Sequence, residues 1–457
     1  MSLPALVTGQ AQHAQPDAGS APKTGTASRA DVTRYEHEHL QTDPNVYVRY
    51  TRPGQCVGAA FRAREFYWRD KRTDTMRVSA TSDSAPAVVI EVAKACAARF
   101  SLENTPVRDL PSLVNLYLWT NQPELAKQAT ARLFRETTTL PAERRAWMTH
   151  TLVTAYFLSM PRRLAEIRSL TARLDSMGAP GANAALLVRV MTANMSYERN
   201  DIEGTMQEAE AGIRAGGLMS KDERADDVAD LSHAYGTLAD GNLLHGGTAA
   251  GLAVVERAPP DLLSTRPPGS PQAMMIQNWI NGYKQFYPHY DKRVVAIEAR
   301  HWFNKSDSTA TYPRAGKVTL VYFAEPSCGG GCYPTNELIH RLHKDYGDRL
   351  DIVLVGKTNG FFRMQLQENT ATEVELIRNY FIDFLKLPVT LAVSETQFAR
   401  SVDGRRFGEP SANQRQWPMP MDVVLVGKDL KVKYLTSNYV AVLRETLLRG
   451  QIDKALQ

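Results

Sequence analysis

Two cysteines, Cys328 and Cys332, stand four positions apart between an apolar run, Val318–Phe323, and a stretch with helical spacing. The apolar run is typical of a buried strand, so the cysteines are expected where a strand passes into the N-terminus of a helix. The free N–H groups and the dipole at that end stabilise a thiolate and lower the pKa of the first sulfur. The pattern therefore predicts a redox-active dithiol.

Such a dithiol exchanges disulfides in two steps. Cys328 precedes the helix and is expected to be the more exposed thiol, so it is the candidate nucleophile. Cys332 is the candidate resolving thiol. Glu325 is the nearest carboxylate and is a candidate for proton handling.

The elements that position the dithiol alternate between strands and helices beyond Lys317. Strands are expected at Val318–Phe323, Leu350–Val355, Asp422–Val426 and Lys431–Leu435, and helices at Pro334–Tyr346, Thr372–Leu385 and Val440–Leu448. This order, ending in a hairpin and a helix, predicts an α/β sheet with helices on both faces.

The order of these elements, with its dithiol, resembles the thioredoxin superfamily, and its TlpA/ResA-like thiol–disulfide branch most closely. The likeness spans about residues 285–457 and is carried by four features: the stretch 316–323, the two cysteines, the run 381–391 and the stretch 419–429. The resemblance implies a thioredoxin-like α/β domain that exchanges protein disulfides and dithiols. It also implies that Pro420 is cis and faces the dithiol, where it exposes backbone for a docking substrate segment.

Three departures from the family pattern concern the dithiol. The family usually has two residues between its cysteines, and here there are three glycines. Helical positions four apart hold their Cβ atoms about 5–6 Å apart, whereas a disulfide needs about 3.5–4.5 Å, so Cys328 must lie off the helix. Ser327 replaces the usual aromatic residue, and Tyr322 replaces the buried acid of thioredoxins proper.

Other functions remain open for the same residues. Sco-type copper proteins also have two cysteines separated by three residues, and soft thiolates suit copper. They add a histidine well downstream, but no histidine follows His343 here, and His340 and His343 are expected on a solvated helix face. A peroxidase is a second alternative, but peroxiredoxins carry a threonine three residues before the reactive cysteine, and Glu325 occupies that position here. A non-catalytic interaction protein with a structural dithiol is the last alternative. The leading interpretation needs no cofactor and no metal.

The segment from about residue 85 to 258 has apolar spacing of three and four, which predicts helices. Chain breaks at 121, 160, 200 and 240 give intervals of 39, 40 and 40 residues. A helix pair of about that length resembles a loose tetratricopeptide array, with an unrelated helical bundle as the alternative. The small residues Ala126, Ala165 and Ala209 suit close helix packing. Scaffolding or binding of a protein partner is the expected role.

Five prolines between residues 259 and 271 predict a stiff linker over 259–273, followed by the second domain at 274–457. The second domain is expected to do the chemistry and the helical region to select the partner. Residues 31–84 allow no assignment. Cys56 and Cys96, 40 positions apart, are either two buried thiols or a structural bridge.

Composition limits the class of protein. With 457 residues, 43% hydrophobic and 23% charged, the chain is expected to fold into two or three globular domains. A net charge of +5 without a basic block argues against nucleic acid or an anionic membrane as main partner. No apolar run reaches the ~20 residues of a membrane span. Residues 1–30 are expected to be a disordered arm or the remnant of a signal peptide. The remnant would place the protein outside the cytoplasm; otherwise a cytoplasmic site is expected.

Overall fold

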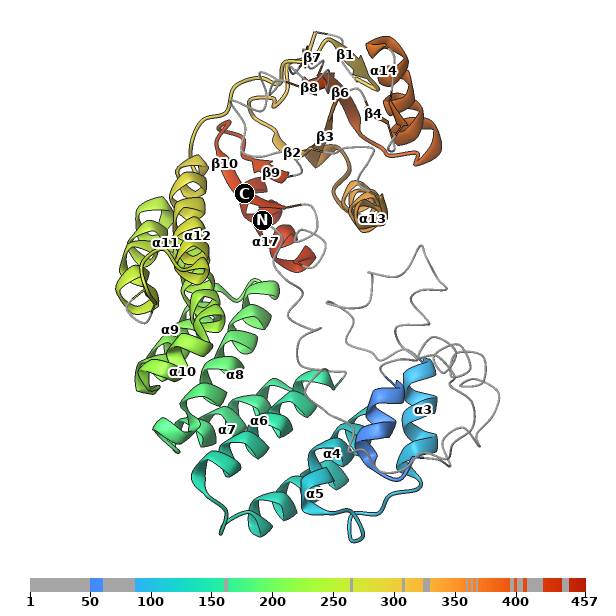
Figure 1. Cartoon of the computed structure of the whole chain (residues 1–457). Coiled ribbons are helices and arrows are strands. Elements are labelled where there is room, and N and C mark those ends of the chain that lie inside the picture. The colour runs from blue at the N-terminus through green and yellow to red at the C-terminus, as the bar shows by residue number, and fades with distance from the viewer. Residues whose placement is uncertain are drawn as a thin grey trace. The chain divides into compact units, whose positions relative to one another are not determined.

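Helices make up the described chain as far as residue 289, and a mixed sheet with its own helices follows (Figure 1). The structure is a computed structural model. It describes residues 50–60, 87–159, 163–263, 266–305, 309–323, 329–358, 361–362, 365–366, 369–394, 398–400, 406–408, 422–437 and 444–457. Within these ranges no helix combines the length and the apolar character needed to cross a membrane. The predicted fold class, a helical region followed by an α/β region, is confirmed.

Successive helical hairpins form the first region. Its helices are α3 (Ala87–Ala97), α4 (Leu110–Trp119), α5 (Pro123–Glu136), α6 (Ala142–Leu158), α7 (Leu164–Asp175), α8 (Ala179–Glu198), α9 (Ile202–Leu218), α10 (Lys221–Asp226), α11 (Val228–Leu263) and α12 (Pro271–Phe286), with short 3-10 turns at Val107–Asp109 and Tyr287–His289. Helices α4 and α5, α6 and α7, and α8 and α9 pair as hairpins, and α4, α6, α8 and α11 pack side by side in that order. This stacking agrees with a helical repeat.

Three of the four expected chain breaks are confirmed. Asn121 and Asn200 lie in the turns just after α4 and α8 and have positive φ angles of 56° and 61°, and a third break separates α6 from α7. The fourth, expected at 240, is wrong. Helix α11 continues through Asp240 and bends at Gly247, whose φ of 81° suits a glycine.

The small residues expected at helix contacts are only partly confirmed. Ala126 and Ala209 are fully buried, but Ala165 is exposed. Helix α7 instead buries Ile167 and Leu174 against its neighbours.

The stretch 259–273, expected to be a linker, is mostly helical. Helix α11 reaches Leu263, and α12 begins at Pro271, where the Ser270 side chain accepts a hydrogen bond from the N–H of Ala273 at 3.2 Å. Ile276 and Ile280 of α12 are 1% exposed and belong to the helical core. Helical packing therefore extends past residue 274, the expected start of the second domain.

The second region is built on a six-stranded sheet with the order β1-β6-β3-β2-β9-β10. Its strands are β1 (His301–Phe303), β2 (Val318–Phe323), β3 (Leu350–Lys357), β6 (Thr390–Ser394), β9 (Asp422–Val426) and β10 (Val432–Ser437). Strands β2, β3 and β6 are parallel to one another, and β9, β10 and β1 each run antiparallel to their neighbour. Two short hairpins lie outside the sheet: β4 (Phe361–Phe362) with β5 (Gln365–Leu366), and β7 (Phe398–Arg400) with β8 (Arg406–Gly408).

One face of the sheet carries the helices. These are α13 (Gly329–Tyr346), α14 (Thr370–Arg378) with its continuation η6 (Asn379–Phe384), and α17 (Glu445–Leu456), and all three contribute to one core cluster with β2. From β2 to β3 and from β3 to β6 the chain steps toward the same edge of the sheet. Because such connections are right-handed, α13 and α14 are placed on the same face. Among the described residues the three helices of this region thus lie on one face, where helices were expected on both. Residues from 286 to 305 and from 309 to 312, including Phe286 at the end of α12, Tyr290, Trp302 and Tyr312, pack on the other face.

The two regions are joined by direct contacts. After α12 the chain pairs with the outer edge of β10, where the N–H of Asp291 donates to the carbonyl of Val432 at 2.9 Å. The hydroxyl of Tyr290 accepts a hydrogen bond from the N–H of Leu435 at 3.1 Å and donates to its carbonyl at 3.0 Å. Tyr197 of α8 belongs to the same buried cluster as the helix-bearing face of the sheet. The pairing covers a sheet edge that would otherwise expose unpaired groups.

Candidate functional site

The junction between β2 and α13 is where the dithiol occurs. Strand β2 ends at Phe323 and α13 begins at Gly329, so Cys332 is the fourth residue of the helix. In the sequence, Cys328 directly precedes the first residue of this helix. Cys328, Glu325 and Pro420 lie outside the described residues, and Cys332 is described only as part of α13.

The local sequence explains the junction. All six residues of β2 are buried, because the strand lies at the centre of the sheet between β3 and β9. A helix that starts directly after such a strand directs its unpaired N–H groups and the positive end of its dipole to the sheet edge. A thiolate at this edge is stabilised by both.

The register of the sheet brings a second segment to the same edge. Strand β9 runs antiparallel to β2, with Tyr322 opposite Val423. The chain therefore enters β9 at Asp422, beside the point where β2 ends. Pro420 precedes that entry by two residues.

Helix α13 is held firmly against the sheet and against α17. Its inner side buries Leu338, Ile339 and Leu342 to 2% exposure or less. Arg341 makes an ion pair with Glu445 of α17 at 2.5 Å. Burial acts to raise the pKa of Glu445, but hydrogen bonds and charge from Arg341 and Arg449 outweigh burial and hold the pKa below its ordinary value.

A buried amide on α13 was not identified from the sequence. Asn336 is 4% exposed, and its Oδ1 atom has no hydrogen-bond partner among the described residues. It follows Cys332 by four positions, so the two residues share one side of the helix. The signal was available, since a polar residue at an inward position of an apolar stripe is unusual.

Tyr322 occupies the strand position where the resemblance would place an acid. It is 1% exposed and packs in the same cluster as Leu338 and Ile339 of α13. An aromatic ring, and not a carboxylate, therefore lies beneath the dithiol helix.

The two histidines of α13 are exposed, as expected. The Nε2 atom of His340 lies 3.2 Å from the carbonyl oxygen of Leu385. Over the described ranges, no group of three or more His, Cys, Asp or Glu side chains could hold a metal ion.

Cys56 and Cys96 form a disulfide with a Cα–Cα distance of 5.8 Å, and both are fully buried. The bridge joins the helical residues 53–60 to α3. Nearby in sequence, Arg52 makes an ion pair with the buried Asp109 at 2.7 Å. A pocket lined by Thr51, Pro53, residues 98–101 and residues 104–106 carries hydroxyl, amide and guanidinium groups but no thiol.

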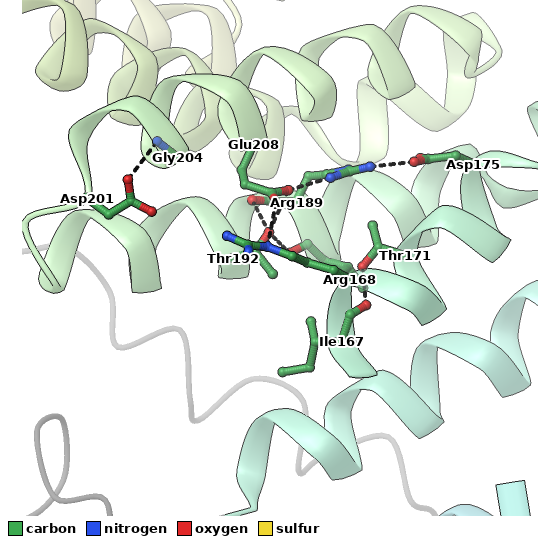
Figure 2. A network of polar contacts seen from close by, with 10 residues as sticks. Ile167, Arg168, Thr171, Asp175, Arg189, Thr192, Asp201, Gly204 and Glu208 are labelled. Carbon is green, nitrogen blue, oxygen red and sulfur yellow. Dashed lines mark hydrogen bonds and ion pairs between the residues drawn. The ribbon is translucent and has the colours of Figure 1, made fainter. Parts of the chain in front are cut away.

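A second polar cluster lies within the helical region (Figure 2). Glu208 of α9 is 7% exposed and pairs with Arg189 of α8 at 2.5 Å and with Arg168 of α7 at 3.7 Å. Thr192 donates a hydrogen bond to Glu208 at 3.1 Å, and Arg189 also pairs with Asp175. Because the charges are paired across three helices, the cluster fixes their register and offers no free nucleophile.

Comparisons with known proteins add one structure. No protein-family description matches the chain, and no curated protein does. A solved structure described as the thioredoxin-like superfamily protein SPOA0173 is 16% identical, with a TM-score of 0.26, over 36% of this chain and 96% of the other. That likeness concerns the fold alone, and its TM-score carries no weight. The thioredoxin-like fold rests instead on the strand order. Strands β2 and β3, which α13 connects, are parallel, and strands β9 and β10, which precede α17, are antiparallel.

Proposed function

We propose that this protein is a thiol–disulfide oxidoreductase of the TlpA/ResA-like kind, with Cys328 and Cys332 as its working pair. The observation that carries the proposal is the arrangement at one sheet edge. There β2 ends, α13 begins at the residue after Cys328, and the chain returns to the sheet at the first residue of β9, two positions after Pro420 in the sequence. A dithiol at a helix N-terminus has a lowered pKa at its first sulfur.

The reaction is a pair of thiol–disulfide exchanges. The Cys328 thiolate attacks one sulfur of a substrate disulfide, and the other sulfur leaves as a thiolate. The Cys332 thiolate then attacks Cys328 of the mixed disulfide and releases the second substrate thiolate. The protein dithiol has lost two electrons to the substrate disulfide, and the reverse order oxidises a substrate dithiol.

Three further roles belong to the proposal. Glu325 handles protons near the sulfurs, and the backbone beside Pro420 docks an extended substrate segment. The helical region binds the protein partner that carries the disulfide. The Cys56–Cys96 bridge supports an oxidising compartment, because disulfides persist there and are rare in reducing cytosol.

The test is reduction of insulin disulfides by the full chain in the presence of a dithiol reductant. We expect wild-type protein to exceed the reductant alone, Cys328→Ser to lose the acceleration, and Cys332→Ser to accumulate a mixed disulfide. His343→Gln, an exposed change on the same helix, is the matched control and should keep full activity.

Wild-type protein no faster than the reductant would contradict the proposal. Stoichiometric copper in anaerobically purified protein, lost in Cys332→Ser, would favour copper binding instead.

A further inference from the structure

Arg444 is a cation without a charged partner at the junction of the helical and α/β regions. It directly precedes α17, and its guanidinium carbon lies 4.5 Å from the centre of the Tyr197 ring of α8. Within the described ranges its guanidinium forms no ion pair and no hydrogen bond. The side chain is half-buried, and the positive end of the α17 dipole disfavours a cation at this position. A charge taken out of water is costly unless it is paired, so this arginine calls for a functional explanation.

Asp240 supplies a negative charge from the helical region. It lies in α11, is half-buried, and accepts a hydrogen bond from the hydroxyl of Tyr287 at 2.7 Å. Burial raises the pKa of Asp240, and the positive charge of Arg444 opposes that rise. The two charges are therefore close enough to interact, yet in the described chain they form no ion pair with each other. Glu198 acts on Arg444 more weakly than Asp240 does.

Two tyrosines lie beside this pair of charges. Burial raises the pKa of Tyr283 and of Tyr290, and both tyrosines interact with the charges of Asp240 and Arg444. These four residues are thus gathered well inside the molecule. None of them is fully covered, so each still reaches solvent. Groups that are deep and yet accessible line a crevice, which we call the junction crevice.

We propose that the junction crevice binds a free amino acid as its zwitterion, with the carboxylate on Arg444 and the ammonium on Asp240. A guanidinium makes two parallel hydrogen bonds to a carboxylate. An ammonium pairs with a carboxylate and is attracted to the faces of tyrosine rings. The crevice holds one charge of each sign, which matches a ligand without net charge better than a simple anion or cation. Ligand sites are frequent at such junctions.

The bound amino acid would connect the two regions of the chain. Asp240 belongs to α11 of the helical region, and Arg444 directly precedes α17 of the α/β region. A ligand that touches both stabilises the folded chain, because it binds the folded state and not the unfolded one. The site is independent of the dithiol, so it stands apart from the proposed oxidoreductase activity.

The test is calorimetric titration of the full chain with each of the standard free L-amino acids in turn. We expect at least one of them to bind with one site per chain. Its N-acetyl derivative lacks the ammonium and its amide lacks the carboxylate, so both should bind at least about tenfold more weakly. Arg444→Gln and Asp240→Asn should each weaken binding of the free amino acid to a similar extent. A panel without saturable binding would overturn the inference.

Arg349→Gln is the matched control. Arg349 is exposed, and its guanidinium carbon also lies over a tyrosine ring, 5.4 Å from the centre of Tyr346, so this variant should keep the wild-type affinity. The thermal midpoint of the wild-type protein should rise with the amino acid, and that of Arg444→Gln should not. If Arg444→Gln does not fold, Arg444→Lys keeps the charge without the planar fork and should bind several-fold more weakly.

Two further results would contradict the proposal. One is equal affinity of the free amino acid for the wild-type protein and for a folded Arg444 variant. The other is an N-acetyl derivative that binds as tightly as the free amino acid, because the ammonium would then have no role.

Discussion

The hydroxyl of Tyr290 is the clearest test of how the helical and α/β regions are joined. It makes hydrogen bonds of 3.0 and 3.1 Å to the carbonyl and the N–H of Leu435, at the outer edge of β10. Burial, with help from Tyr434 and Asp240, raises the pKa of Tyr290 well above its ordinary value. The residue as a whole is partly exposed, and its hydroxyl is held by the two main-chain groups of Leu435.

Tyr290→Phe removes one oxygen and keeps the ring. Two main-chain groups of Leu435 then lose a partner, and each such loss costs about 1–3 kcal/mol when the group is buried. We expect the free energy of unfolding to fall by about 2–4 kcal/mol, measured by urea unfolding with far-UV circular dichroism. Hydrogen exchange of peptides from α8 and β10 should show both segments opening in the same cooperative step, because Tyr197 of α8 packs in the core of the α/β region.

Tyr346→Phe is the matched control. Its hydroxyl makes a long contact of 3.4 Å to the carbonyl of Arg449 and also interacts with the Asp453 side chain, but it bridges no pair of main-chain groups, so we expect a smaller loss of about 1 kcal/mol. A loss below about 0.5 kcal/mol in Tyr290→Phe, or separate opening of α8 and β10, would refute the reasoning that one cooperative structure spans both regions.

Two further predictions concern buried groups in the helical region. Replacing both Cys56 and Cys96 by alanine removes a disulfide that spans 40 residues. Chain entropy predicts that the free energy of unfolding, measured with urea, falls by about 4 kcal/mol. An equal fall in Cys328→Ser would show that loss of the disulfide is not the cause. Burial, and then the nearby Asp227, raise the pKa of Asp230 to about 6. The folded state thus holds this proton more tightly than the unfolded state, whose carboxyl has a pKa of about 3.9. Stability should therefore fall as pH rises from about 4 to 7. Asp230→Asn should stabilise the protein by on the order of 2 kcal/mol at pH 7 and leave it unchanged near pH 3, and equal effects at both pH values would contradict the raised pKa.

Local signals were sufficient to predict the dithiol junction. The apolar run 318–323, the glycines after Cys328 and the spacing of the following helix are features of adjacent residues, and β2 and α13 occur where they indicate. Strands β1 and β6 were missed because β1 is short and half-buried, and β6 is a run of five residues that follows the end of a helix after a short loop.

Glycines and prolines led to wrong predictions of turns and linkers at positions where tertiary packing decides the role of the residue. Asp240 and Gly241 resemble a turn, yet the Asp240 carboxylate accepts a hydrogen bond from the Tyr287 hydroxyl at 2.7 Å. A Cβ on Gly241 would lie 2.8 Å from Met206, so this glycine serves close helix packing. Pro271 was taken for a linker residue but begins α12, a position that suits proline.

The central claim is that Cys328 is an activated thiol paired with Cys332. The most direct measurement is the alkylation rate of Cys328 against pH in the full-length Cys332→Ser variant, with Cys328→Ser as the reciprocal variant. We predict that Cys328 titrates clearly below the ordinary thiol value of ~8.5 and that wild-type protein forms the disulfide reversibly. Titration of both thiols near ~8.5, with no disulfide formed under oxidant, would contradict the claim.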